Sequence, residues 1–125
     1  MTNSTAPVVA CEEIHPGLVV SDLAAAIEFY EKRLGFRLVS TWGDPATFAG
    51  VNLGKVQVYL MRGVPAPSAT GASVFFSVGD VDELYAFHLA SGVEVVEEIG
   101  DRVFGMRDYV VKDLYGYRLV FGQYI

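Results

Sequence analysis

The pattern of apolar and polar residues predicts the same order of elements twice along the chain. Each time, an alternating strand is followed by a helix that begins at an acidic capping residue and ends at a glycine, and three more strands follow. In the first block we expect a strand at 12–20, a helix at 21–34 and strands at 36–42, 48–53 and 55–61. In the second block we expect a strand at 73–78, a helix ending near 91–92 and strands at 93–99, 106–111 and 117–124.

The two blocks also match residue by residue. The stretch V-S-D-L around Asp22 is echoed by V-G-D-V around Asp80, 58 residues later, and Gly35 is echoed by Gly92 at an offset of 57. An internal repeat of this kind fixes the architecture before any single element does. It predicts an α+β fold made of two related βαβββ modules, with a helix on one face of each sheet and the other face left to form a cup or to meet a partner.

The repeat also predicts the domain organisation. A chain of 125 residues is ordinarily one domain. We expect a single domain over 1–125, with module one at about 12–62, a linker at 63–72 and module two at about 73–124. The linker is the only segment rich in glycine, proline and small polar residues, and it falls between the two repeats.

Charge and composition exclude several partner classes. The net charge of −6 repels phosphate backbones, so we expect no nucleic-acid partner; it favours a cationic ligand or serves solubility alone. Cys11 is the only cysteine, which excludes an intrachain disulfide and a cysteine-based zinc site. No run has membrane-spanning length and the first residues do not read as a signal peptide, so we expect a cytoplasmic protein without a membrane partner.

Two stretches resemble a known superfamily. The sequence I-H-P-G-L-V-V-S-D-L…F-Y-E-K-R-L-G-F at 14–36 resembles the opening of the vicinal oxygen chelate superfamily, which includes glyoxalase I, extradiol dioxygenases and bleomycin-resistance proteins. K-D-L-Y-G-Y-R-L-V-F at 112–121 resembles its closing hairpin, with Leu114 and Tyr115 in place of the usual proline and acid. The resemblance covers about 13–123. It implies a cupped mixed sheet around a small-molecule cavity and a homodimer whose cavities are often built by both subunits.

The resemblance also bears on metal binding. Enzymes of the superfamily hold one divalent metal with His and Glu side chains at four positions, which fall here on His15, Tyr59, Ser73 and Val120. Only His15 is a conventional ligand, because a phenol, a hydroxyl and an alkyl group do not replace imidazoles and carboxylates. We therefore expect no metal, no cofactor and no catalytic residue. We interpret His15 as a pocket-wall or hydrogen-bonding residue and His88 as a packed or surface histidine.

Strand alternation gives a candidate lining for the cup, which is largely aromatic and contains methionine. Such a surface suits a hydrophobic or aromatic molecule. Asp108 would pair with a cationic ligand, or with Arg102, Arg107 or Arg118 in a purely structural role. The aromatic residues would alternatively pack on one another or on a second subunit. The predicted ligand-binding residues are His15, Gln57, Tyr59, Met61, Ser73, Phe75 and Asp108, with Trp42, Phe48, Phe104 and Met106 at the rim.

Three functions fit these observations. The first is a metal-free protein that sequesters a hydrophobic or aromatic compound such as an antibiotic, as the bleomycin-resistance-type relatives do. The second is a glyoxalase- or dioxygenase-like enzyme with an unusual site, in which His15 and Tyr59 transfer protons if they face each other. The third is a module that only dimerises or senses a ligand for a partner.

Overall fold

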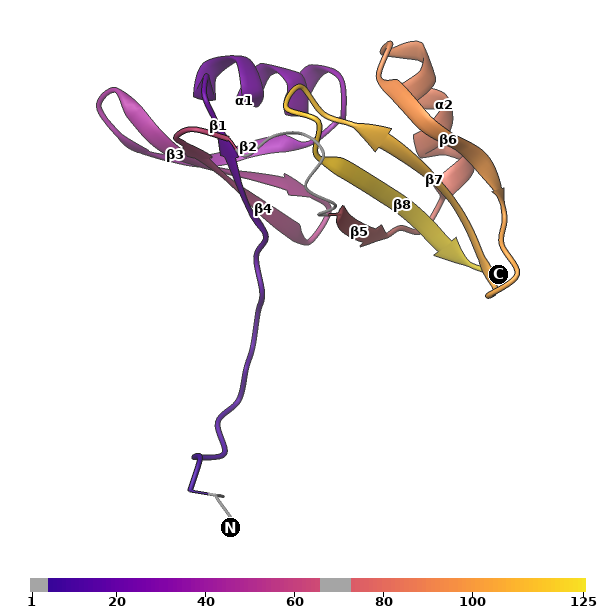
Figure 1. The fold of residues 1–125 in the computed structure, drawn as a ribbon, viewed down its shortest axis with the longest axis horizontal. Helices are drawn as coiled ribbons and strands as arrows, with labels where there is room; N and C mark the ends of the chain where they lie inside the picture. The colour runs from indigo at the N-terminus through magenta and orange to yellow at the C-terminus, as the bar shows by residue number, and fades with distance from the viewer. Residues whose placement is uncertain (1–4, 66–72) are drawn as a thin grey trace.

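The fold consists of eight strands and two helices, arranged as two modules side by side (Figure 1). The computed structural model describes residues 5–65 and 73–125, so most of the expected linker, 66–72, lies outside the described residues. The first module contains β1 (Gly17–Val20), α1 (Leu23–Lys32), β2 (Arg37–Gly43), β3 (Ala46–Leu53) and β4 (Val56–Arg62). The second contains β5 (Ser73–Ser77), α2 (Val81–Ala90), β6 (Glu94–Asp101), β7 (Met106–Lys112) and β8 (Arg118–Tyr124).

Each module forms its own four-stranded mixed sheet. The strand orders are β1-β4-β3-β2 and β5-β8-β7-β6, and in each sheet the first strand of the module pairs in parallel with the last, while the other pairs are antiparallel. The two helices lie on the same side of the molecule (Figure 1). The α+β class with two βαβββ modules is therefore confirmed. Among the helices described, none is long and apolar enough to cross a membrane.

The first strand is shorter than the sequence predicts. We expected it at 12–20, whereas β1 begins at Gly17. Its partner β4 begins at Val56, and the register pairs Gly17 with Tyr59, so Ile14 would lie opposite Val56 and the expected strand residues 12 and 13 have nothing to pair with. Residues 5–14 are exposed and run away from the body of the module (Figure 1).

The helices begin and end where the repeat predicts. The Asp22 carboxylate accepts a hydrogen bond from the Ala25 amide at 3.0 Å, and Asp80 caps α2 in the same way. Gly35 and Gly92 follow the helices with φ of 84° and 76°, values that only glycine adopts readily. The repeated sequence motif is thus a repeated helix-capping motif.

One hydrophobic core is shared by both modules. Phe36 of the first module packs edge-on against Phe76 of the second, with ring centroids 5.7 Å apart, and Phe76 stacks on Phe121 at 4.7 Å. All three rings are buried. Buried side chains of both modules therefore belong to the same apolar cluster, and separating the modules would expose part of it.

His88 lies at the centre of this shared core. Its side chain is fully buried, with Nε2 2.9 Å from the carbonyl oxygen of Leu34 and Nδ1 2.7 Å from the Tyr109 hydroxyl. A carbonyl can only accept, so Nε2 carries the proton and Nδ1 accepts from Tyr109. Burial lowers the pKa of His88 below its usual value of 6.5, against the smaller opposing effect of the Leu34 carbonyl. The interpretation of His88 as a packed histidine is confirmed.

We expect the stability to depend on pH through His88. Because the pKa of His88 is lower in the folded chain, the unfolded chain takes up the proton first as the pH falls. The neutral ring therefore stabilises the fold fully above pH 6.5 and progressively less below pH 6.5. The difference in unfolding free energy between the wild-type protein and His88→Gln should shrink as the pH falls from about 7.5 to about 5.5, by at most about 1.4 kcal/mol per pH unit. Urea unfolding followed by circular dichroism measures this difference at each pH. A difference that stays constant with pH would contradict a lowered pKa of His88.

A second buried polar cluster also joins the modules. The Tyr30 hydroxyl donates to Oδ2 of Asp113 at 2.7 Å, and Oδ1 of Asp113 accepts from the amides of Tyr115 and Tyr117 at 2.9 and 3.0 Å. Burial raises the pKa of Asp113, while the hydrogen bonds from Tyr30 and the backbone act in the opposite direction. Asp113 therefore fixes both the connection between β7 and β8 and its contact with α1.

Candidate functional site

Most of the predicted ligand-binding residues of the first half share one face of its sheet, opposite α1. We call this the module-one face; it carries Trp42, Phe48, Gln57, Tyr59 and Met61. The register sets Phe48 opposite Met61 on one side and Trp42 on the other. The residues of β4 that alternate with Gln57, Tyr59 and Met61, namely Val58 and Leu60, are fully buried on the opposite face. Alternation along the strands therefore places these five side chains on the surface that α1 leaves uncovered.

Aromatic rings gather at the centre of the module-one face. Tyr59 lies between His15 and Phe48, with ring centroids 4.8 Å from each. Trp42, beside Phe48 in the register, is 73% exposed. A half-buried set of rings with one open indole offers stacking surface to a flat molecule.

His15 is held by two acceptors. Its Nδ1 lies 3.2 Å from the carbonyl oxygen of Gln57, and its Nε2 lies 2.7 Å from the carboxylate of Glu13. Since both partners accept, both contacts together need the doubly protonated ring. His15 and Tyr59 do lie close together, with ring planes tilted by 40°, but both ring nitrogens of His15 lie within hydrogen-bond distance of other groups. This geometry fits a wall residue better than a proton-transfer pair.

Asn52 is a candidate site residue that the sequence analysis missed. It pairs with Gln57 in the register and so shares the module-one face, and its Oδ1 is buried with no hydrogen-bond partner in the described part of the chain. A buried acceptor without a partner costs about 1–3 kcal/mol, so it calls for an explanation such as a ligand donor. The signal was present in β3, where the alternation that placed Phe48 on this face also places Asn52 there.

The predicted residues of the second half lie on the other sheet. Ser73 and Phe75 are on β5, Met106 and Asp108 on β7, and Phe104 on the turn between β6 and β7. Phe75 and Phe104 are 73% and 67% exposed. Within residues 5–65 and 73–125, no hydrogen bond, ion pair or aromatic contact joins these residues to the module-one face. The eleven-residue site thus stays a prediction, split over two surfaces.

The carboxylate of Asp108 forms an ion pair with an arginine of the same chain. Nε of Arg102 lies 2.6 Å from its carboxylate, and Nη2 of Arg102 also donates to the carbonyl oxygens of Asp108 and Glu98. Asp108 is 7% exposed, whereas the side chain of Arg102 is 28% exposed, so the carboxylate is shielded and the guanidinium stays partly open to solvent. Of the two roles left open by the sequence, the geometry matches the structural one, in which the guanidinium fills the place of a cationic ligand.

Within the part of the chain that the structure describes, the predicted residues form no candidate metal site and line neither of the two grooves given below. Among the described residues, no three side chains of the histidine, cysteine, aspartate or glutamate type lie close enough to hold one ion. The structure contains grooves of about 690 and about 420 Å³, and none of the eleven predicted residues lines either of them. On this chain alone, the module-one face is an open platform.

Residues 14–121 match the family model described as the Glyoxalase/Bleomycin resistance protein/Dioxygenase superfamily. The chain belongs to this superfamily. The resemblance found in the sequence is thereby confirmed. Superfamily members perform different functions on the same fold, so membership establishes the architecture and leaves the function to the site.

Among individual proteins, the chain is 30% identical to the uncharacterized protein Mb0911c of Mycobacterium bovis, over 88% of this chain and 82% of that one. TioX from Micromonospora sp. ML1 has a similar structure, with a TM-score of 0.76 and 27% identity over 91% of this chain and 97% of that chain. The bleomycin-binding protein of bleomycin-producing Streptomyces verticillus, solved with copper(II)-bleomycin, gives a TM-score of 0.73 and 25% identity over the same shares.

Proposed function

We propose that the protein binds and sequesters a hydrophobic or aromatic small molecule, without a metal of its own and without catalysis. The observation that carries this proposal is the module-one face, where the rings of His15, Tyr59 and Phe48 gather on the same side of the sheet as the unpaired acceptor of Asn52. Rings supply stacking surface and the amide oxygen would orient one polar group of the ligand. Similarity to a bleomycin-binding protein makes an antibiotic of that kind the first compound to test.

We also propose that the functional unit is a homodimer. Trp42, Phe75 and Phe104 are each more than two-thirds exposed, as is Ile14 in the segment before β1. Exposed large apolar side chains in this number favour a surface that a partner or a ligand covers. A second copy that set its module-two sheet against the module-one face would bring the two separated sets of predicted residues together.

The proposal is tested by titrating the protein with metal-free bleomycin and with copper(II)-bleomycin while recording Trp42 fluorescence. Since Trp42 is the only tryptophan, its signal reports on the module-one face directly. We expect saturable changes with at least one compound. Flat traces with both, and with other aromatic antibiotics, would contradict sequestration through this face, and a stoichiometric divalent metal in elemental analysis would contradict a metal-free site.

Variants on the module-one face should separate stacking from hydrogen bonding. We expect Tyr59→Ala to weaken binding by about tenfold, because the central ring is lost, and Tyr59→Phe to bind nearly as well as wild type. Asn52→Ala should weaken binding by about three- to tenfold through loss of one hydrogen bond. Isothermal calorimetry measures both. Equal affinities for Tyr59→Ala and Tyr59→Phe would show that the ring does not contact the ligand.

A further inference from the structure

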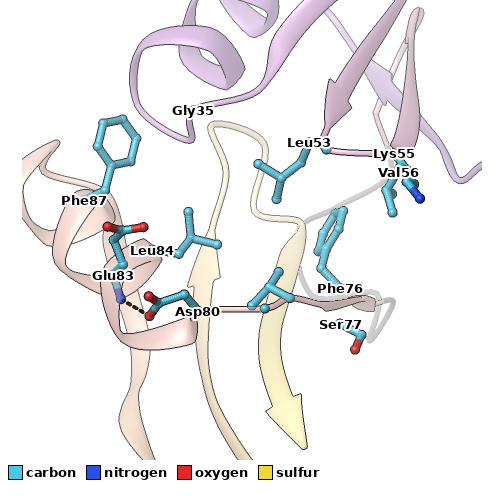
Figure 2. Close-up of a pocket in the computed structure, with 13 residues that line it drawn as sticks. Gly35, Leu53, Lys55, Val56, Phe76, Ser77, Asp80, Glu83, Leu84 and Phe87 are labelled. Atoms are coloured by element: carbon cyan, nitrogen blue, oxygen red, sulfur yellow. Dashed lines mark hydrogen bonds between the residues drawn. The ribbon is translucent and has the colours of Figure 1, made fainter.

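A groove of about 690 Å³ lies between the two modules on the side of the helices, away from the module-one face. Its walls come from the turn between β3 and β4, the end of β5 and the first turns of α2 (Figure 2). The rings of Phe76 and Phe87 and the side chain of Leu84 supply apolar surface, and the backbone around Asp80 lies at its polar end. The volume is within the range of small-molecule sites.

The repeat shows which side chains contact the equivalent backbone at the start of α1. At the start of α1, the Tyr115 hydroxyl accepts a hydrogen bond from the Asp22 amide at 3.0 Å and donates to the Asp22 carbonyl oxygen at 3.2 Å. The Tyr117 hydroxyl donates to the carbonyl oxygen of Val19 at 2.8 Å. The chain therefore places phenol groups against the backbone that leads into its first helix.

The equivalent phenol groups are missing at α2 because the two hairpins differ in length. Residues 113–117 connect β7 to β8 and carry both tyrosines, whereas only Gly54 and Lys55 connect β3 to β4, and Val56 opens β4. The backbone of Asp80 is close to that of Asp22, with φ and ψ of −137° and 83° against −124° and 99°, and the Asp80 carbonyl accepts the Leu84 amide as the Asp22 carbonyl accepts the Ala26 amide. In the described part of the chain no side chain reaches the Asp80 amide.

We propose that this groove between the modules binds a small neutral phenol. The aromatic ring would lie among Phe76, Leu84 and Phe87, and the hydroxyl would meet the amide and carbonyl of Asp80 as Tyr115 meets those of Asp22. The apolar walls supply the contact area, and the backbone pair selects a hydroxyl that both accepts and donates. The lining carries two carboxylates, Asp80 and Glu83, against the single ammonium of Lys55, and this charge balance favours a neutral ligand over an anionic one.

The test uses p-cresol, which is the tyrosine side chain as a free molecule, and toluene, which lacks the hydroxyl. With ¹⁵N-labelled protein, we expect p-cresol to shift the amide resonances of Asp80, Leu84 and Phe87 saturably. Toluene should bind about three- to tenfold more weakly, because the hydrogen bonds to the backbone are lost. Equal affinities for the two compounds, or no shifts up to the solubility limit of p-cresol, would overturn the proposal.

A substitution that fills the groove provides a second test of the proposed phenol site. Val56 lines the groove and is 43% exposed, so Val56→Tyr should fold and place a phenol where p-cresol would sit, while Val56→Thr keeps the branched shape as a control. We expect Val56→Tyr to lose the p-cresol shifts and Val56→Thr to retain them. Unchanged p-cresol binding by Val56→Tyr would overturn the site, and so would amide shifts confined to the module-one face. Groove resonances that respond to protein concentration without ligand would also overturn it, since a second copy of the chain would then cover the groove. Trp42 fluorescence should not respond to p-cresol, which keeps this test independent of the proposed antibiotic binding.

Discussion

Replacing His88 with alanine should lower the free energy of unfolding by about 4 kcal/mol, the largest effect that we expect from any single change. The imidazole is fully buried, and its loss leaves a cavity between the modules. It also leaves the Leu34 carbonyl and the Tyr109 hydroxyl without their partner. Because whole domains are stable by only about 5–15 kcal/mol, this variant should be close to unfolding at physiological temperature. Urea unfolding followed by circular dichroism above pH 7 measures the loss.

The next residue on α2 provides the control. Leu89 is 51% exposed, so Leu89→Ala should cost no more than about 1 kcal/mol while changing the same helix. His88→Gln, which can both donate to Leu34 and accept from Tyr109, should fall between the two. Similar losses for His88→Ala and Leu89→Ala would show that His88 does not join the modules in the way its contacts indicate.

The second large effect is expected at Asp113. Asp113→Ala should lower the free energy of unfolding by about 3 kcal/mol, because the Tyr30 hydroxyl and the amides of Tyr115 and Tyr117 all lose their acceptor inside the protein. The connection between β7 and β8 should also loosen. Thermal or urea unfolding gives the energy, and faster amide hydrogen exchange at Tyr115 and Tyr117 reports the local change.

Two variants sharpen the assignment of Asp113. Asp113→Asn keeps one oxygen for the two amides and avoids burying a charge, so it should lose less than half as much stability as Asp113→Ala. Tyr30→Phe removes one of the three hydrogen bonds and should cost about 1 kcal/mol. If Asp113→Asn were as damaging as Asp113→Ala, the charge would matter more than the hydrogen bonds.

The fold could be predicted from the sequence because its strongest signals are local. Alternation and helical spacing fix the elements, the acidic caps at Asp22 and Asp80 fix where the helices begin, and Gly35 and Gly92 fix where they end. The start of β1 was wrong for a physical reason. Residues 12 and 13 lie beyond the start of the partner strand β4, and the alternation of residues 12–20 contains no information on where β4 begins.

The site was harder to predict because it depends on contacts between distant segments. The module-one face followed from alternation, but the sequence could not choose among three arginines for Asp108, and only the folded turn brings Arg102 to it. Asn52 was missed because an unpaired acceptor is defined by what surrounds it. The groove beside α2 depends on the lengths of two hairpins compared in space, which a linear pattern does not show.

The Tyr30–Asp113 hydrogen bond has a consequence for how the two repeats diverge. A phenol in one repeat and a carboxylate in the other satisfy each other, so neither position can drift alone without leaving a buried polar group stranded. Among relatives of this chain, positions 30 and 113 should therefore change in concert, and chimeras that exchange a single repeat should lose stability unless the two parents carry the same pair of residues at these positions.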